Sequence, residues 1–305
     1  MLQIDTIEEA RELFKALGSD VRIDIIKYLQ IHPNISMKEL AAAVGITNGA
    51  LTAHIQKLEA AGVVRVSQDS TVHGNQKLLS LAIDKLLVNM EPPKRNENVV
   101  TADIKVGQYS DFHVYPTCGL STPTEVIGEV DDPRYFAHTD HYKADILWFM
   151  RGYVEYMIPN FVPKNNRITS IKVSAEISSE APGVNENWPS DITISVNGTE
   201  VGMWTSPGDF GERRGILTPD WWFSNWNQYG LLKVFDINSE GTFVDGFKIS
   251  DVTMDDLDID PSSQIRFRFS VEDDAKHVGG LTIFGRTFGN YAQDIKTTLT
   301  YEPVA

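Results

Sequence analysis

The spacing of apolar residues along the chain changes character near residue 91. Before that point apolar residues recur every three or four positions, as in 21–29 and 51–58, which is the spacing of one helix face. After residue 98 they alternate with polar residues, as in 192–196 and 265–269, which is the period of a half-buried strand. The pattern predicts a two-domain α+β protein with a helical domain at 1–90, a linker at 91–98 and an all-β domain at 99–305.

The segment between the two patterns, Glu91–Asn98, reads EPPKRNEN. Its two prolines disfavour a helix, and the other six residues are polar or charged. We therefore predict that this segment is a linker and belongs to neither domain.

Two helices joined by a short turn are predicted in the first domain. Ser36, followed by Glu39, can form a capping box for a helix that Gly45 ends. A second helix, capped by Asn48, runs to about Ala60, and an apolar hairpin follows. This order is typical of a winged helix-turn-helix, whose second helix lies in the major groove of DNA.

The second helix carries the candidate DNA contacts. Its apolar residues Leu51, Ile55 and Leu58 face inward, so the residues between them face solvent. Asn and Gln amides can pair bidentately with adenine, and Lys and His suit phosphate oxygens; His54 could equally be a plain surface residue. The predicted DNA-binding residues are Asn48, Gly49, Thr52, Ala53, His54, Gln56 and Lys57 on this helix, and Arg65, His73 and Lys77 on the hairpin.

The stretches FKALGSDVRIDIIKYL and ELAAAVGITNGALTAHIQKLEAAGVV, with the hairpin after them, resemble ArsR-type winged-helix transcriptional regulators over about residues 5–90. The resemblance implies a homodimer on a pseudo-palindromic double-stranded DNA operator, held by the first and last helices, here about Thr6–Leu17 and Ile83–Met90. Metal sensors of this family carry Cys or His in the helix before the turn or in the last helix. Residues 37–44 and 83–90 contain neither, so we expect no metal and no other cofactor.

The second domain is predicted to be an all-β sandwich of jelly-roll type. Its alternating stretches are separated by Gly, Pro, Asn and Asp, and no long helical pattern interrupts them. Asn197-Gly198, between two such stretches, predicts a tight hairpin turn. A barrel with an internal cavity is the alternative. The clearest predicted strands are 146–156, 168–177, 192–204, 231–237, 243–249, 264–271, 281–284 and 295–301.

All six tryptophans lie in the second domain, four of them between residues 204 and 226. Most of that stretch is a predicted loop, where strand packing does not explain so many rings. Flat aromatic faces can stack on a sugar while charged and amide groups bond its hydroxyls, which indicates an effector site. The alternative is an internal plug at the mouth of the sandwich. The predicted ligand-binding residues are Trp204, Asp209, Arg213, Arg214, Trp221, Trp222, Trp226 and Tyr229.

Charge and cysteine content narrow the class of protein. The formal net charge is −15, of which residues 1–90 carry only −1, so bulk attraction to nucleic acid or a membrane is excluded. A local basic face on the first domain remains compatible with this balance. The single cysteine, Cys118, allows no intramolecular disulfide, and we find no apolar leader or long apolar run. We therefore expect a cytoplasmic protein with no membrane association.

Two further groups of residues are weaker candidates for metal binding. His138 and His141, with His113, offer imidazoles, but without a shared strand or helix register they predict no zinc site. The acidic run 251–260 lacks the glycine and terminal glutamate of a calcium-binding loop, which favours a solvated loop.

These features together predict a DNA-binding repressor whose β domain senses a small molecule such as a sugar or oligosaccharide. We expect no enzymatic activity, because the chain has no nucleophile, phosphate-binding or dinucleotide-binding motif. Two alternatives stay open: a carbohydrate-active enzyme with a regulatory DNA-binding head, and a β-sandwich that serves as a protein-interaction module.

Overall fold

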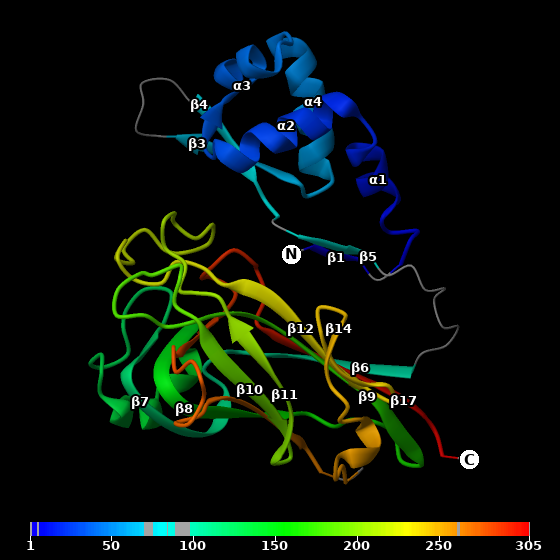
Figure 1. Ribbon diagram of the computed structural model, residues 1–305, viewed down its shortest axis with the longest axis vertical. Helices are drawn as coiled ribbons and strands as arrows, with labels where there is room; N and C mark the ends of the chain where they lie inside the picture. Colours follow the sequence, from blue (N-terminus) through cyan, green and yellow to red (C-terminus); the bar gives the residue numbers. More distant parts are fainter. Residues whose placement is uncertain are drawn as a thin grey trace. The chain divides into compact units, whose positions relative to one another are not determined.

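The computed structural model describes residues 2–4, 6–69, 76–83, 85–88, 98–260 and 263–304. The chain divides into two compact units, Met1–Arg95 and Asn96–Ala305, each with its own apolar core (Figure 1). Of the predicted linker 91–98, only Asn98 lies within the described residues, where it begins a strand.

The N-terminal unit packs four helices against a small antiparallel sheet with the strand order β2-β4-β3. Leu13, Ile25, Leu40, Leu51 and Leu58, one or more from each helix, are buried in a common core. The predicted helix pair and hairpin are confirmed. The elements are α1 (Arg11–Leu17), α2 (Asp20–Ile31), β2 (Ile35–Ser36), α3 (Met37–Val44), α4 (Asn48–Ala60), β3 (Val64–Asp69) and β4 (Gln76–Leu81).

The ends of α3 and α4 follow from local side-chain chemistry. The Ser36 hydroxyl accepts a hydrogen bond from the Glu39 N–H, and the Glu39 carboxylate accepts one from the Ser36 N–H, as the capping box predicts. Gly45 ends α3 with a positive φ of 74°. The predicted cap of α4 is wrong by one residue. Thr47, in extended conformation, accepts from the Ala50 N–H, and Asn48 is already helical.

The two helices expected to hold a dimer together differ from the prediction. The first begins at Arg11 instead of Thr6. The predicted last helix, Ile83–Met90, is wrong: within its described part, Leu86–Val88 form a strand, β5, paired in parallel with β1 (Leu2–Ile4). The Leu2 N–H donates to the Lys85 carbonyl at 2.7 Å. A short apolar run is compatible with a helix or a strand. Here residues 2–4, distant in the sequence, supply the backbone hydrogen-bond partners of a strand.

The C-terminal unit is all-β, as predicted, and every predicted stretch contains a strand. Asn197 and Gly198 both have positive φ and form the predicted hairpin turn, whereas 243–249 is broken into two strands by Asp245 and Gly246, also with positive φ. The strands are β6 (Asn98–Ile104), β7 (Tyr109–Ser121), β8 (Ile146–Ile158), β9 (Asn166–Ser178), β10 (Ser190–Val196), β11 (Thr199–Ser206), β12 (Leu231–Asn238), β13 (Gly241–Val244), β14 (Phe247–Ser250), β15 (Ile265–Val271), β16 (Leu281–Phe284) and β17 (Ile295–Pro303).

Hydrogen bonding arranges these strands as two layers joined by one short strand. One layer has the order β7-β8-β15-β10-β11, and the other has the order β6-β17-β9-β12-β13-β14. β16 pairs with the start of β8 through Thr282↔Trp148 and with the end of β9 through Thr282↔Ser178. The described strands of this unit therefore belong to one continuous sheet folded on itself (Figure 1). The jelly-roll connectivity stays a prediction.

Aromatic side chains fill the space between the layers. The Phe235 ring, on β12, lies 6.5 Å from that of Phe267 and 5.9 Å from that of Phe269, both on β15. All three side chains are buried. Because a residue of one layer touches two of the other, the two layers share a single core.

We expect Phe235→Ala to destabilise the C-terminal unit by about 3–5 kcal/mol, since it opens a cavity between the layers. Denaturant unfolding followed by tryptophan fluorescence measures this, because all six tryptophans lie in this unit. Phe247, which is 78% exposed on β14, gives a matched control: Phe247→Ala should change the unfolding free energy by no more than about 0.5 kcal/mol. Equal losses in the two variants would contradict the shared core.

Candidate functional site

Helix α4 presents a polar outer face to solvent. Leu51, Ile55 and Leu58 are buried against the core of the N-terminal unit, as their spacing predicts. His54 is half-buried at the edge of the exposed face. The exposed predicted DNA contacts on this helix are Asn48, Gly49, Thr52, Ala53, Gln56 and Lys57.

The side chains on this face differ in what they can offer a base. The Thr52 hydroxyl donates to the Asn48 carbonyl of its own helix at 2.8 Å, so only its lone pairs are left to a ligand. At Gly49 an added Cβ would meet no atom within 4 Å, so the bare backbone lets another surface come close. The amides of Asn48 and Gln56 are therefore the groups best able to donate and accept at once.

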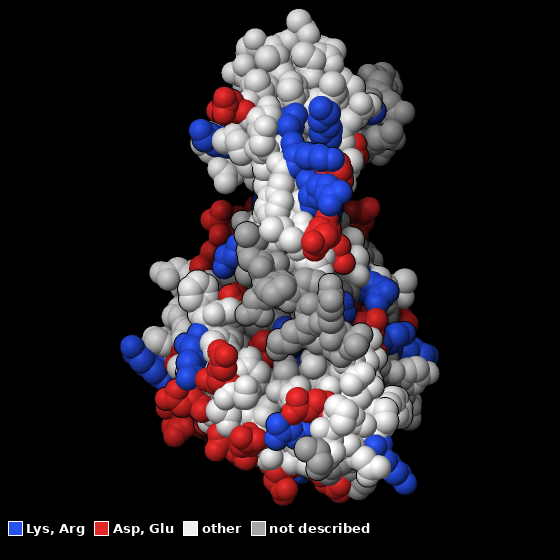
Figure 2. All heavy atoms as spheres, turned by 90° about the vertical axis from the view of Figure 1, so that its right-hand side faces the viewer, with Lys and Arg blue, Asp and Glu red and all other residues white. Residues whose placement is uncertain are grey.

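Positive charge lies beside this helix. Lys57 and Lys77 are exposed, and Arg65 is half-buried, where burial lowers the pKa of its guanidinium from its usual value. Figure 2 shows Lys and Arg side chains gathered on one face of the N-terminal unit and many acidic side chains on the C-terminal unit. The remaining predicted contact, His73, lies outside the described residues.

The C-terminal unit contains a pocket of about 150 Å³ built from several separate segments. Trp148 comes from β8, Thr117 from β7, Glu180 from the segment after β9, and Trp226 and Asn227 from the loop between β11 and β12. The two indole rings lie 5.8 Å apart, inclined at 53°. The pocket thus combines flat apolar walls with a carboxyl, an amide and a hydroxyl group, which is the mixed lining typical of small-molecule sites.

Glu180 is the buried acid of this pocket. Its Oε2 accepts hydrogen bonds from Asn227 Nδ2 at 2.7 Å and from the Thr282 hydroxyl at 2.9 Å. Its Oε1 has a longer contact, 3.4 Å, with the Thr117 hydroxyl. Burial, and after it the nearby Asp209 carboxyl, raises the pKa of Glu180 well above its usual range. Burial therefore makes this carboxyl easier to protonate than an exposed glutamate, and in its protonated form it can donate a hydrogen bond to a ligand.

Asp209, a predicted ligand-binding residue, does not line the pocket but is hydrogen-bonded to a residue that does. It is fully buried and absent from the pocket lining. Its Oδ2 accepts from the N–H of Ala181, which does line the pocket, at 3.1 Å, while Oδ1 has no partner among the described residues. Burial is the main cause that raises the pKa of this carboxyl to about 7.

The predicted aromatic cluster divides between core and pocket. Trp222 is buried; its indole N–H donates to the Asn227 carbonyl at 2.9 Å, and its ring packs edge-on against those of Trp148 and Phe288. Trp222 is therefore part of the interior, as the internal-plug alternative predicted. Trp226 lines the pocket, and Trp221 is 37% exposed with its N–H bonded to the Pro123 carbonyl.

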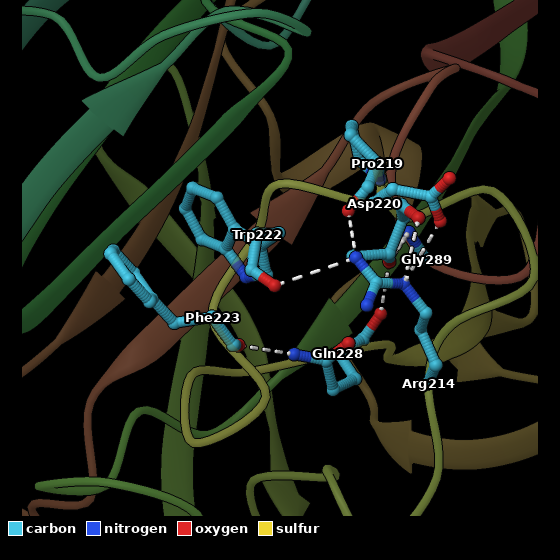
Figure 3. Close-up of polar contacts among 8 residues, drawn as sticks. Arg214, Pro219, Asp220, Trp222, Phe223, Gln228 and Gly289 are labelled. Carbon is cyan, nitrogen blue, oxygen red and sulfur yellow. Dashed lines mark hydrogen bonds and ion pairs between the residues drawn. The ribbon is translucent and has the colours of Figure 1, made fainter.

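Arg214 holds the loop together instead of facing the pocket. Its guanidinium donates to the carbonyls of Thr218, Pro219 and Trp222 (Figure 3). Gln228 Nε2 donates to the carbonyls of Phe223 and Trp226, each at 2.8 Å. These side chains replace the backbone pairing that the loop lacks, so the loop has a defined conformation.

The other predicted ligand residues lie apart from the pocket lining. Trp204, on β11, packs on the main core, with the Lys233 Nζ 4.6 Å from its ring centre. The Arg213 guanidinium lies 5.1 Å from the Tyr229 ring, which stacks on Phe210 at 5.4 Å. Sequence reasoning missed Thr117, Trp148 and Glu180. The cluster of aromatic residues in the sequence indicated only the pocket wall that contains Trp226. The other walls come from segments that are distant in the sequence.

Among the described residues, no three His, Cys, Asp or Glu side chains are grouped so as to hold a metal ion. In the acidic run, Asp251 pairs with Lys248, and Asp256 accepts hydrogen bonds from the Thr253 N–H and hydroxyl. No helix within the described ranges is both long and apolar enough to cross a membrane.

A family model for winged helix-turn-helix DNA-binding domains matches residues 19–65, which contain α2, α3, α4 and the start of β3. The N-terminal unit is a winged helix-turn-helix domain. The predicted winged helix-turn-helix fold is confirmed for this domain. The chain matches no curated protein.

Several solved structures are similar to parts of this chain. A homodimeric domain from Mycobacterium bovis, described as a possible ArsR-family transcriptional regulator, is 21% identical over 25% of this chain and 66% of its own, with a TM-score of 0.23. NolR from Sinorhizobium fredii is 26% identical over 25% of this chain and 72% of its own, also with a TM-score of 0.23. The catalytic domain of a GH87 alpha-1,3-glucanase is 10% identical over 69% of this chain and 29% of its own, with a TM-score of 0.28.

The buried Asp209 makes the stability of the C-terminal unit depend on pH. Its pKa is about 7 in the folded chain and about 4 when unfolded, so the folded state binds more protons between these values. The contribution of Asp209 to the unfolding free energy is therefore fully present below about pH 4 and is lost as pH rises through about 7. We expect Asp209→Asn to remove much of this slope, measured by urea unfolding with tryptophan fluorescence across this pH range.

Burial also raises the pKa of Glu180, so this carboxyl contributes to the slope in both proteins. An identical slope in the wild type and in Asp209→Asn would show that Asp209 is not the titrating group.

Proposed function

We propose that this protein is a transcriptional repressor of ArsR type that binds a double-stranded DNA operator as a homodimer and is released by a neutral sugar bound in its C-terminal unit. The observation that carries the DNA-binding part is the exposed outer face of α4, with the amides of Asn48 and Gln56 directed away from a buried apolar face, in a domain matched by a DNA-binding family model. We propose a homodimer because the similar domain from Mycobacterium bovis is described as homodimeric.

The sugar part of the proposal rests on the pocket. Trp148 and Trp226 provide inclined apolar faces, and Asn227, Thr117 and Glu180 provide hydrogen-bonding groups. Burial disfavours a charged Glu180 carboxylate, and a neutral ligand suits a carboxyl whose charged form is disfavoured. Release of DNA then requires that the sugar bind the DNA-free state more tightly than the DNA-bound state. A cytoplasmic location is part of this proposal.

A second candidate function is glycoside hydrolysis, since two acids, Glu180 and Asp131, line the same pocket. Glycosidases use such a carboxyl pair, with one member held protonated. Release of reducing ends from oligosaccharides by the purified protein, lost in Glu180→Gln, would favour the enzyme. Binding without turnover would favour the sensor.

We expect Asn48→Ala and Gln56→Ala each to weaken operator binding by about 1–3 kcal/mol and to relax the preference at one base position. Lys57→Ala should weaken binding to all sequences alike and lower the slope of log affinity against log salt by about 1. Fluorescence anisotropy with operator and scrambled duplexes over a salt series measures both effects. Lys27, exposed on α2 and paired with Asp24, gives the control Lys27→Ala, which should change neither quantity.

We expect Trp226→Phe to weaken sugar binding by about tenfold, corresponding to the loss of about 1.4 kcal/mol of ring contact. Trp204→Phe makes the same change outside the pocket and should leave sugar affinity unaltered. Calorimetry measures the affinity for glucose, galactose, mannose, xylose and their short oligosaccharides. Release of operator DNA is measured with the same sugars. Equal effects of the two substitutions would contradict the assignment of the pocket as the effector site.

A further inference from the structure

An exposed aromatic ring lies against one of the aromatic residues that line the pocket. The Phe223 side chain is 56% exposed. Its ring centre lies 5.0 Å from that of Trp226, which lines the pocket. Trp221, two residues earlier, is 37% exposed. A single exposed phenylalanine needs no explanation, but this one packs edge-on, at 62°, against an indole that lines the pocket.

The exposed ring is carried on a loop whose backbone is already fixed. The Gln228 amide donates to the Phe223 carbonyl, and Arg214 donates to the Trp222 carbonyl. Figure 3 shows the Phe223 ring pointing away from the hydrogen bonds made by Arg214. A ligand that stacks on Phe223 would therefore not have to order this loop, so less of its binding energy would be lost to entropy.

The pocket itself has room for little more than one ring, at about 150 Å³. A longer ligand must leave through the mouth. Asn225, which is exposed and also lines the pocket, stands in the chain between Phe223 and Trp226. A ligand leaving past these residues would therefore meet an amide and then the Phe223 ring.

We propose that the effector is an oligosaccharide of at least two units, whose terminal unit occupies the pocket and whose next unit stacks on Phe223. This inference rests on the proposed function, because it assigns a second subsite to the same sugar-binding pocket. Phe223 acts as a specificity-determining residue: it adds affinity for a chain and contributes nothing to a free monosaccharide.

The test compares affinity with chain length for the full-length protein. Calorimetry uses glucose, galactose, mannose and xylose, each with its own di- and trisaccharide, against wild type, Phe223→Ala, Phe223→Tyr and Phe247→Ala. In at least one series the trisaccharide should bind the wild type about tenfold more tightly than its monosaccharide, the gain that one aromatic contact supplies. Phe223→Ala should lose this gain and keep the monosaccharide affinity.

Two variants separate stacking from other effects. Phe223→Tyr keeps a flat ring and should keep the gain, and Phe247→Ala removes a ring that is 78% exposed on β14 and should leave both affinities unaltered. Thermal melting confirms that each variant is folded. A monosaccharide that binds as tightly as its trisaccharide, or a gain that survives in Phe223→Ala, overturns this inference and leaves the proposed function standing. Failure of every sugar to bind the wild type overturns both.

Discussion

The pairing of β16 with both β8 and β9 is the constraint on which the C-terminal unit depends. This four-residue strand closes the corner between two layers, and it does so at Thr282, whose register partners are Trp148 and Ser178. The Thr282 hydroxyl also donates to Glu180. The same residue thus joins the layers and positions the carboxyl of the pocket, so the fold and the candidate site are supported by one set of hydrogen bonds.

The loop between β11 and β12 shows how one aromatic cluster can serve two purposes. Trp222 packs into the interior and anchors the loop, while Trp226, in ring contact with it at 4.7 Å, lines the pocket. Burial of one indole therefore fixes the position of its neighbour. Together with the hydrogen bonds from Arg214 and Gln228, this packing makes the pocket wall part of the folded core, and such preorganisation lowers the entropic cost of binding.

The two units differ in net charge and in how they accommodate charged side chains. Residues 1–90 are nearly neutral, so a few basic side chains gathered together suffice to give one face a positive character (Figure 2). The C-terminal unit carries most of the negative charge, and its buried carboxyls include Glu180 and Asp209, whose pKa values burial raises. A neutral buried acid avoids the cost of desolvating an uncompensated charge.

The sequence by itself determined the ends of α3, through Ser36, Glu39 and Gly45, and the inner and outer faces of α4, because capping and helical period are local properties. It also determined that the rest of the chain is β, through alternation and turn residues. Only the tertiary structure decided that 86–88 is a strand, because its partner lies at residues 2–4. Only the tertiary structure decided that Trp222 is buried in the core and that Trp226 lines the pocket. It also decided that Glu180 lines the same pocket, because pockets form where segments distant in sequence meet.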